Sequence, residues 1–124
     1  MTEFLKVEPY LYYPDGRKAL EWLQSTFGFG EIQTFEENGK VSEGSVAVGD
    51  SFVHVSGGRD PGPDNGAGML NIITVDDVDQ LYERIRTAGV DLDPPKNEAY
   101  GPRSINVTDP WGYRWYFWQG SAWQ

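Results

Sequence analysis

Hydrophobic and polar positions follow two different periods along this chain, and the two periods predict both helices and strands. Apolar residues recur every three or four positions over residues 17–27 and again over about 78–88, which is the spacing of an amphipathic helix. A glycine follows each segment directly, and glycine is a common helix terminator. Aspartates precede the second segment, so we expect Asp76 or Asp77 to cap that helix.

Strands are predicted where large apolar residues alternate with polar ones. The first expected strand is rich in tyrosine, and Asn38-Gly39 between the second and third strands is a strong hairpin signal. The segment 97–103, by contrast, has the composition of a loop. The expected strands cover residues 7–13, 31–36, 41–48, 52–56, 69–75, 104–108 and 113–119.

These elements form a pattern that occurs twice, with an offset of about 62 residues. Gly28 corresponds to Gly89, and His54 corresponds to Tyr116. Each copy reads strand, helix and three strands, which predicts an α+β fold of two tandem βαβββ modules. Neither copy alone would bury a good core, so we expect the two to pack as a pseudo-symmetric pair. Their sheets would form a curved cleft with the helices on its convex side.

The predicted organisation is therefore a single domain over residues 1–124. The first module is expected at about 5–57 and the second at about 69–120. Glycine, proline and polar residues dominate positions 58–68, which predicts a linker between the modules.

Composition and charge narrow the class of protein. The 124 residues carry a formal net charge of −9, and the mean hydropathy is −0.54. Such an acidic chain does not favour nucleic acid as a partner, because binding its phosphates needs a clustered basic face. We expect a cytoplasmic protein with no membrane partner, because no apolar run has membrane-spanning length and the N-terminus lacks a secretory pattern. The absence of cysteine excludes disulfides and thiol ligands.

Four motifs add to the repeated layout. They are Ala19-Leu20-Glu21-Trp22-Leu23 with Phe27-Gly28-Phe29, Val75-Asp76-Asp77-Val78-Asp79, Tyr100-Gly101-Pro102-Arg103, and Asp109-Pro110-Trp111-Gly112. Together they resemble the vicinal oxygen chelate superfamily, which contains glyoxalase I, extradiol dioxygenases, fosfomycin-resistance enzymes and metal-free bleomycin-resistance proteins. The resemblance spans nearly the whole chain. It is specific for the fold, whereas the same scaffold hosts unrelated chemistries.

The resemblance implies where a metal would bind. Metal enzymes of this superfamily place four ligands on the opening and closing strands of the modules, and the matching positions are Glu8, His54, Leu70 and Tyr116. Leu70 cannot bind a metal, and a phenol is a poor ligand unless it is ionised, which occurs near pH ~10. Glu8 and His54 alone provide fewer ligands than a catalytic site normally has. We therefore expect no metal and no other cofactor, with Glu8 and His54 as the remaining weak metal candidates.

Strand alternation predicts which side chains face the cleft. Val53 and Val55 fit the helix-packed face of their strand. Trp115 and Phe117 fit the same face in the second copy, so their neighbours point the other way. The predicted cleft is lined by Tyr10, Tyr12, Phe52, His54, Leu70, Ile72, Asn106, Arg114, Tyr116 and Trp118. Apolar walls with a few orienting polar groups are typical of a small-molecule site.

Aromatic residues are the best candidates for direct ligand contact. Tyr116 and Trp118 would stack on a flat ligand. The loop that carries Tyr100 and Arg103 closes the cleft in members of the superfamily, so the resemblance adds both residues to the expected ligand contacts. Structural packing of this loop is the alternative.

Two functions follow from these residues. The first is a metal-free binding protein of the drug-resistance type, which sequesters a hydrophobic aromatic small molecule or antibiotic, with a cationic planar compound suited to the acidic chain. The second is a superfamily enzyme, such as a lyase, isomerase or dioxygenase. In that enzyme Glu8 and His54 would act as an acid–base pair or as metal ligands, with Arg114 holding an anionic group.

A homodimer is also expected. Trp111 is predicted at an exposed hairpin tip, and two four-stranded modules leave open sheet edges.

Overall fold

The structure, a computed structural model, describes residues 1–62 and 68–121. The chain divides into two compact units, unit 1 (Met1–Pro61) and unit 2 (Gly62–Gln124). Each unit contains one four-stranded mixed sheet and one helix, so the predicted α+β class with two βαβββ modules is confirmed. The expected linker at 58–68 crosses the boundary between the units, and its residues 63–67 lie outside the described residues.

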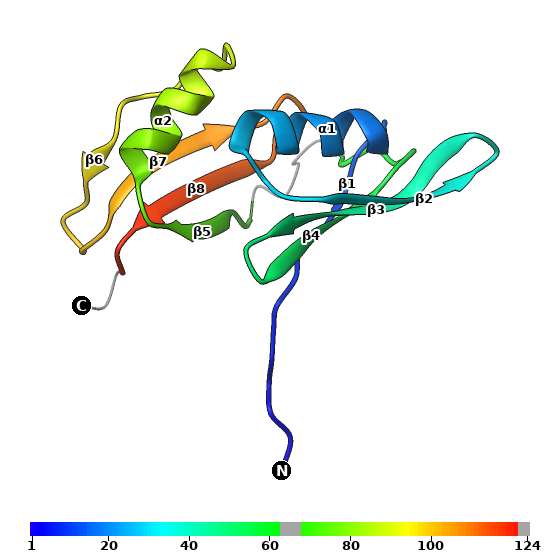
Figure 1. Cartoon of the computed structure of the whole chain (residues 1–124), viewed down its shortest axis with the longest axis horizontal. Coiled ribbons are helices and arrows are strands. Elements are labelled where there is room, and N and C mark those ends of the chain that lie inside the picture. Colours follow the sequence, from blue (N-terminus) through cyan, green and yellow to red (C-terminus); the bar gives the residue numbers. More distant parts are fainter. Residues whose placement is uncertain (63–67, 122–124) are drawn as a thin grey trace. The chain divides into compact units, whose positions relative to one another are not determined.

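Unit 1 contains β1 (Tyr10–Tyr12), α1 (Gly16–Phe27), β2 (Ile32–Glu37), β3 (Lys40–Val48) and β4 (Ser51–Ser56). The strand order is β1-β4-β3-β2, and β1 runs parallel to β4 while the other pairs are antiparallel. Figure 1 shows α1 lying along one face of this sheet. The other face carries no helix of unit 1 and is called here the open face of unit 1.

Unit 2 contains β5 (Asn71–Val75), α2 (Val78–Thr87), β6 (Lys96–Asn97), β7 (Arg103–Thr108) and β8 (Arg114–Gln119). Its strand order, β5-β8-β7-β6, repeats that of unit 1, again with a single parallel pair at the first strand (Figure 1). The two-residue β6 falls just at the start of the segment that was expected to be loop. The face of this sheet opposite α2 is called the open face of unit 2.

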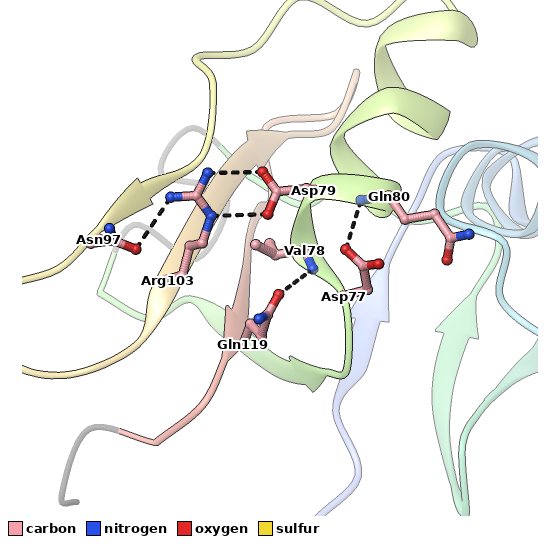
Figure 2. A network of polar contacts seen from close by, with 7 residues as sticks. All are labelled: Asp77, Val78, Asp79, Gln80, Asn97, Arg103 and Gln119. Carbon is pink, nitrogen blue, oxygen red and sulfur yellow. Dashed lines mark hydrogen bonds and ion pairs between the residues drawn. The ribbon is translucent and has the colours of Figure 1, made fainter.

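Both helices begin and end close to the predicted residues. The Asp15 carboxylate accepts a bond from the Lys18 N–H at 3.1 Å, and Gly28 ends α1 with a left-handed φ of 78°. Of the two caps proposed for α2, Asp77 is the one observed, and it accepts a bond from the Gln80 N–H at 3.0 Å (Figure 2). No helix among the described residues is long and apolar enough to cross a bilayer.

The first strand is shorter than predicted, because regular pairing with β4 covers only Tyr10 to Tyr12. Pro9 has no N–H to donate to the ladder, so pairing starts after it. Its carbonyl oxygen still accepts a bond from the His54 N–H at 3.0 Å. Residues 1–9 form an extended arm in which Leu5 and Val7 are 82% and 94% exposed (Figure 1).

Each unit has its own core between the helix and the sheet. In unit 1, Leu20 and Leu23 of α1 are fully buried, and Gly44 of β3 makes room for Leu20. A Cβ on Gly44 would lie 2.5 Å from Leu20 Cδ1. In unit 2 the core side chains are Val78, Ile85, Ile105, Val107, Trp115 and Phe117.

Candidate ligand-binding faces

The open face of unit 1 presents aromatic side chains to solvent, as the alternation predicts. Along β1, Leu11 is buried beneath the helix, whereas Tyr10 and Tyr12 are 48% and 40% exposed. Their rings meet edge to face, with centroids 5.9 Å apart. Phe52 and His54 of β4 are half-buried on the same face, and Val53 and Val55 between and beyond them are buried on the other.

Glu8 and His54 lie side by side at the edge of this face. Glu8 Oε1 is 2.9 Å from His54 Nε2, and the two side chains are about one third exposed, at 32% and 39%. Next to this contact, the Pro9 carbonyl oxygen accepts a bond from the His54 N–H, which holds the arm against β4. The structure therefore brings together the two residues that were singled out as an acid–base pair.

Glu43 is a further carboxylate on this face that the sequence analysis missed. The Tyr10 hydroxyl donates a hydrogen bond of 2.6 Å to it, and this bond is the main reason why the pKa of Tyr10 is raised. Burial acts in the same direction, while the hydrogen bond with Ser56 and the charge of Arg59 act against it. The residue is hidden in the sequence because a β-bulge reverses the alternation of β3. Phe35 pairs with Glu43 but Glu36 pairs with Val41, which leaves Ser42 as the extra residue.

Two cations of the chain cover aromatic rings of the same face. The Lys6 ammonium lies 6.0 Å from the centre of the Phe52 ring and also donates to the Asp50 carbonyl oxygen. The Arg59 guanidinium lies 5.1 Å from the centre of the Tyr12 ring. Both distances are within the range of a cation–π interaction. Neither cation was found from the sequence, because both lie outside the strands whose alternation was analysed.

The open face of unit 2 is built from three paired strands. Ile72 of β5 and Asn106 of β7 both pair with Tyr116 of β8, and Ile72 is 48% exposed. Two positions further along β8, Trp118 is half-buried, and the Tyr100 ring lies 5.8 Å from it at an angle of 57°. The structure thus brings together five of the predicted contacts: Ile72, Tyr100, Asn106, Tyr116 and Trp118.

Trp118 has an unsatisfied polar atom. Its indole Nε1 is buried and has no hydrogen-bond partner among the described residues. The neighbouring polar groups are already engaged with one another, since the Ser104 hydroxyl donates a 2.8 Å bond to the Glu98 carboxylate. A buried donor without an acceptor costs about 1–3 kcal/mol, so it is unusual in a stable fold.

Arg103 does not lie on the open face. Figure 2 shows its guanidinium directed to α2, where Nε and Nη2 donate bonds of 2.9 and 2.8 Å to the Asp79 carboxylate, and Nη1 donates to Asn97. This ion pair lowers the pKa of Asp79 and raises that of Arg103. Arg103 is the first residue of β7, and its position is one residue out of phase with Ser104 and Asn106. Of the two roles considered for Arg103, ligand contact and structural packing, its position fits structural packing.

Leu70 and Arg114 occupy less central places than predicted. Leu70 is half-buried and precedes β5, which begins at Asn71 rather than at the expected Met69. The Arg114 side chain donates a 2.8 Å bond to the Met69 carbonyl oxygen, so part of its donor capacity is used within the unit.

The turn at Trp111 also differs from the prediction. Trp111 is half-buried, although an exposed hairpin tip was expected. The cause is Asp109, which is 3% exposed and accepts bonds from the backbone N–H groups of Trp111 and Tyr113 and from the Trp115 indole. These bonds fold the turn back against β8.

The donor set does not fit the four-ligand metal centre of the superfamily's metal enzymes. Glu8 and His54 are close enough to share an ion, but Leu70 has no ligand atom. Among the described residues no group of three or more His, Asp or Glu side chains is arranged to hold a metal.

Comparison with known protein families identifies the family of this chain. Residues 5–117 match the family described as the Glyoxalase/Bleomycin resistance protein/Dioxygenase superfamily. The chain belongs to this superfamily. The resemblance inferred from the sequence motifs is therefore confirmed, while no functionally curated protein matches the sequence.

Several solved structures are similar to the chain. TioX from Micromonospora sp. ML1 is 26% identical, with a TM-score of 0.77 over 95% of this chain and 100% of TioX. The bleomycin-binding protein from bleomycin-producing Streptomyces verticillus, solved with copper(II)-bleomycin, is 25% identical, with a TM-score of 0.73 over 98% and 100% of the two chains. Lactoylglutathione lyase from Agrobacterium tumefaciens, at 18% identity and a TM-score of 0.71 over 98% of each chain, shares the fold alone.

Proposed function

We propose that this protein is a metal-free binding protein of the drug-resistance type, which sequesters an aromatic small molecule. The observation that carries the proposal is the set of aromatic rings on the open faces, which the cores of the units do not use. Tyr10 and Tyr12 in unit 1 and Tyr100 in unit 2 are each 40% to 48% exposed. Exposed rings of this kind offer large contact area at a small entropic cost.

Trp118 supports the same function and indicates one feature of the ligand. Its ring faces Tyr100 at 5.8 Å, and its indole N–H lacks an acceptor among the described residues. A ligand with a carbonyl, hydroxyl or ether oxygen would satisfy this donor if its binding moved the atoms that cover Nε1. Removal of an unsatisfied donor adds to the free energy of binding.

Similarity to a drug-binding protein supports this proposal as well. The Streptomyces verticillus relative binds bleomycin in its copper(II) form, and it covers nearly all of this chain at 25% identity. Sequestration needs no catalytic residue, which agrees with the incomplete set of metal ligands.

The test is a titration of intrinsic tryptophan fluorescence with a panel of planar drugs and aromatic metabolites. Trp118→Ala and Tyr116→Ala should each weaken a bound aromatic ligand by about 1–3 kcal/mol, because each removes contact area. Trp118→Phe keeps a smaller ring and loses the N–H, so its effect combines the lost hydrogen bond with some lost ring area. Trp22→Phe, in the α1 helix of the other unit, is the matched control and should leave affinity unchanged. Saturable binding that none of the β8 variants affects would refute this site.

A second function is favoured by one observation, the 2.9 Å contact between Glu8 and His54. A carboxylate that orients an imidazole is a common acid–base arrangement, so the chain would be a superfamily enzyme acting on a carbonyl or cyclic metabolite. In that case His54→Ala and Glu8→Gln should abolish turnover while affinity stays close to that of the wild type. Elemental analysis of the purified protein tests the metal. About one tightly held ion per chain, lost in either variant, would favour a metal enzyme.

We also propose that the protein is a cytoplasmic homodimer. Each sheet has two open edges, at β1 and β2 in unit 1 and at β5 and β6 in unit 2, and unpaired backbone groups at an open edge are available for pairing with another chain. Sedimentation velocity at micromolar concentration should give twice the mass of the 14.0 kDa chain. A single 14.0 kDa species over the whole concentration range would exclude the dimer.

A further inference from the structure

The open face of unit 1 contains a hollow that joins two predicted lining residues, Tyr10 and His54, to two that the sequence did not indicate, Phe35 and Glu43. It is shallow, has a volume of about 320 Å³, and lies between β1, β2, β3 and β4. Its prominent side chains are Tyr10, Phe35, Glu43 and His54. Phe35 is 60% exposed although it lies within a sheet, so its ring is available for contact from the solvent side.

The charged groups around this hollow differ in whether they have a charged or aromatic partner. Two aromatic rings of the same face already hold a cation of the chain, Phe52 with Lys6 and Tyr12 with Arg59. Glu8 likewise has a partner in His54. Glu43 differs, because within the described part of the chain it is bonded only by the neutral hydroxyl of Tyr10.

We infer that this hollow binds an organic cation with a flat ring, which Glu43 attracts by charge and Phe35 and Tyr10 hold by stacking. The chain's own cations show that aromatic rings of this face suit positive charge, since both lie within cation–π distance. In the hollow a carboxylate and exposed rings meet, and among the described residues no Lys or Arg forms an ion pair with Glu43, while His54 of the lining is bonded to Glu8. The site deepens the proposed function and rests on it, because it names the charge of the sequestered ligand.

Glu43 owes its position to the bulge at Ser42, which gives the inference a structural basis beyond composition. If β3 ran on from Val41 without a bulge, regular alternation would place Glu43 on the same helix-facing side as Val41, which is 7% exposed. The sheet thus directs one acidic side chain from its buried face to its open face.

The experiment compares three probes with one ring system and different charge: 1-methylquinolinium, quinoline and quinoline-4-carboxylate. Affinities are measured by calorimetry at pH 7.5 and low salt, and amide chemical shifts locate the bound probe. The expected order is cation, then neutral ring, then anion, with at least about a tenfold step from cation to neutral ring, which corresponds to about 1.4 kcal/mol. The largest shifts should be at Tyr10, Phe35 and Glu43.

Variants separate local recognition from the net charge of −9. Glu43→Gln keeps the shape and an acceptor for Tyr10, so it should reduce the affinity for 1-methylquinolinium to that for quinoline. Glu37→Gln removes the same charge from the end of β2 and is the matched control. Phe35→Leu should weaken both probes. Arg59→Gln should strengthen cation binding severalfold, because it removes a repelling charge beside Tyr12.

Equal affinities for the three probes, no measurable binding of 1-methylquinolinium, or equal effects of Glu43→Gln and Glu37→Gln would each overturn the inference. Its failure is distinguishable from failure of the proposed function. Neutral aromatic ligands that bind and depend on Trp118 would preserve sequestration and remove only the cation site. Absence of binding by every probe and every planar aromatic compound would remove both.

Discussion

The two units share one topology but hold their helices in different ways. In unit 1, six residues of α1 are buried against the sheet, among them Leu20, Leu23 and Phe27. In unit 2 only Val78 and Ile85 of α2 are buried, and polar contacts supplement them. Figure 2 shows the Arg103–Asp79 pair and the Gln119 side chain, which holds the first residue of α2. A repeated fold can therefore keep its strand order while apolar packing in one copy is partly replaced by hydrogen bonds in the other.

The start of each helix shows the same contrast at corresponding positions. In unit 1, Gly16 opens α1 directly against Gly57, and a Cβ on Gly16 would lie 3.1 Å from Gly57 Cα. In unit 2 the corresponding residues are Val78 and Gln119, and Gln119 Oε1 accepts a 2.9 Å bond from the Val78 N–H. Unit 1 brings two backbones together, whereas unit 2 spans the same place with a side chain.

The largest expected effect tests the difference in apolar packing. Leu20→Ala should lower the free energy of unfolding by about 2–5 kcal/mol, because it leaves a cavity beneath α1. Leu81→Ala, at a half-buried position of α2, should cost clearly less. Urea denaturation followed by circular dichroism measures both. Equal losses would mean that α2 depends on apolar burial as much as α1 does.

An intermediate effect is expected where the helices begin. Gly57→Ala should destabilise the protein by about 1–3 kcal/mol, because an added methyl group forces backbone to move. The cause is the Val41 carbonyl oxygen, which would lie 2.1 Å from the new Cβ. Gln119→Ala should cost about 0.5–2 kcal/mol through the lost cap of α2.

The control for these two variants is Gly68→Ala, since a Cβ there meets nothing within 4 Å. In thermal unfolding, the Tm of Gly57→Ala should be lower than that of Gln119→Ala, and the Tm of Gly68→Ala should stay near that of the wild type. The reverse ranking would contradict the close approach of the two backbones in unit 1.

The smallest effect concerns the ion pair of unit 2 and depends on pH. Arg103 lowers the pKa of Asp79 in the folded state. The pair therefore stabilises the fold above the unfolded pKa of Asp, about 3.9, and this contribution is lost as pH falls through the lower folded value. The Tm difference between wild type and Arg103→Gln should be constant near pH 7 and should shrink at strongly acidic pH.

Arg86→Gln, which removes the exposed pair with Glu83, is the control for loss of a surface charge. An Arg103→Gln deficit that persists undiminished in acid would show that Arg103 acts through Asn97 or packing rather than through the charge of Asp79.

The sequence predicted the fold well because local signals agreed with one another. The period of the helices, the aspartate cap of the second helix, the terminal glycines and the repeat offset all pointed to the same elements. The open-face residues of β1, β4 and β8 followed from simple alternation. Glu43 could not be found in this way, since one extra residue in β3 reverses which side chains face solvent.

Contacts made by residues outside the strands could not be predicted from the sequence either. Lys6 and Arg59 reach their aromatic partners from irregular chain, where no period indicates direction. The motif around Arg103 predicted a loop, but Arg103 is the first residue of β7. Its guanidinium forms an ion pair with Asp79 of α2. The sequence shows that Arg103 is charged but does not indicate that Asp79 is its partner.

The N-terminal arm has a practical consequence for anyone preparing this protein. Its backbone before Pro9 is extended and its apolar side chains are exposed, which makes it an accessible substrate for contaminating proteases. Cleavage after Lys6 would carry away the ammonium that lies over Phe52. Batches with intact and trimmed N-termini should therefore differ in their ligand affinity, so mass spectrometry of each batch belongs beside every titration.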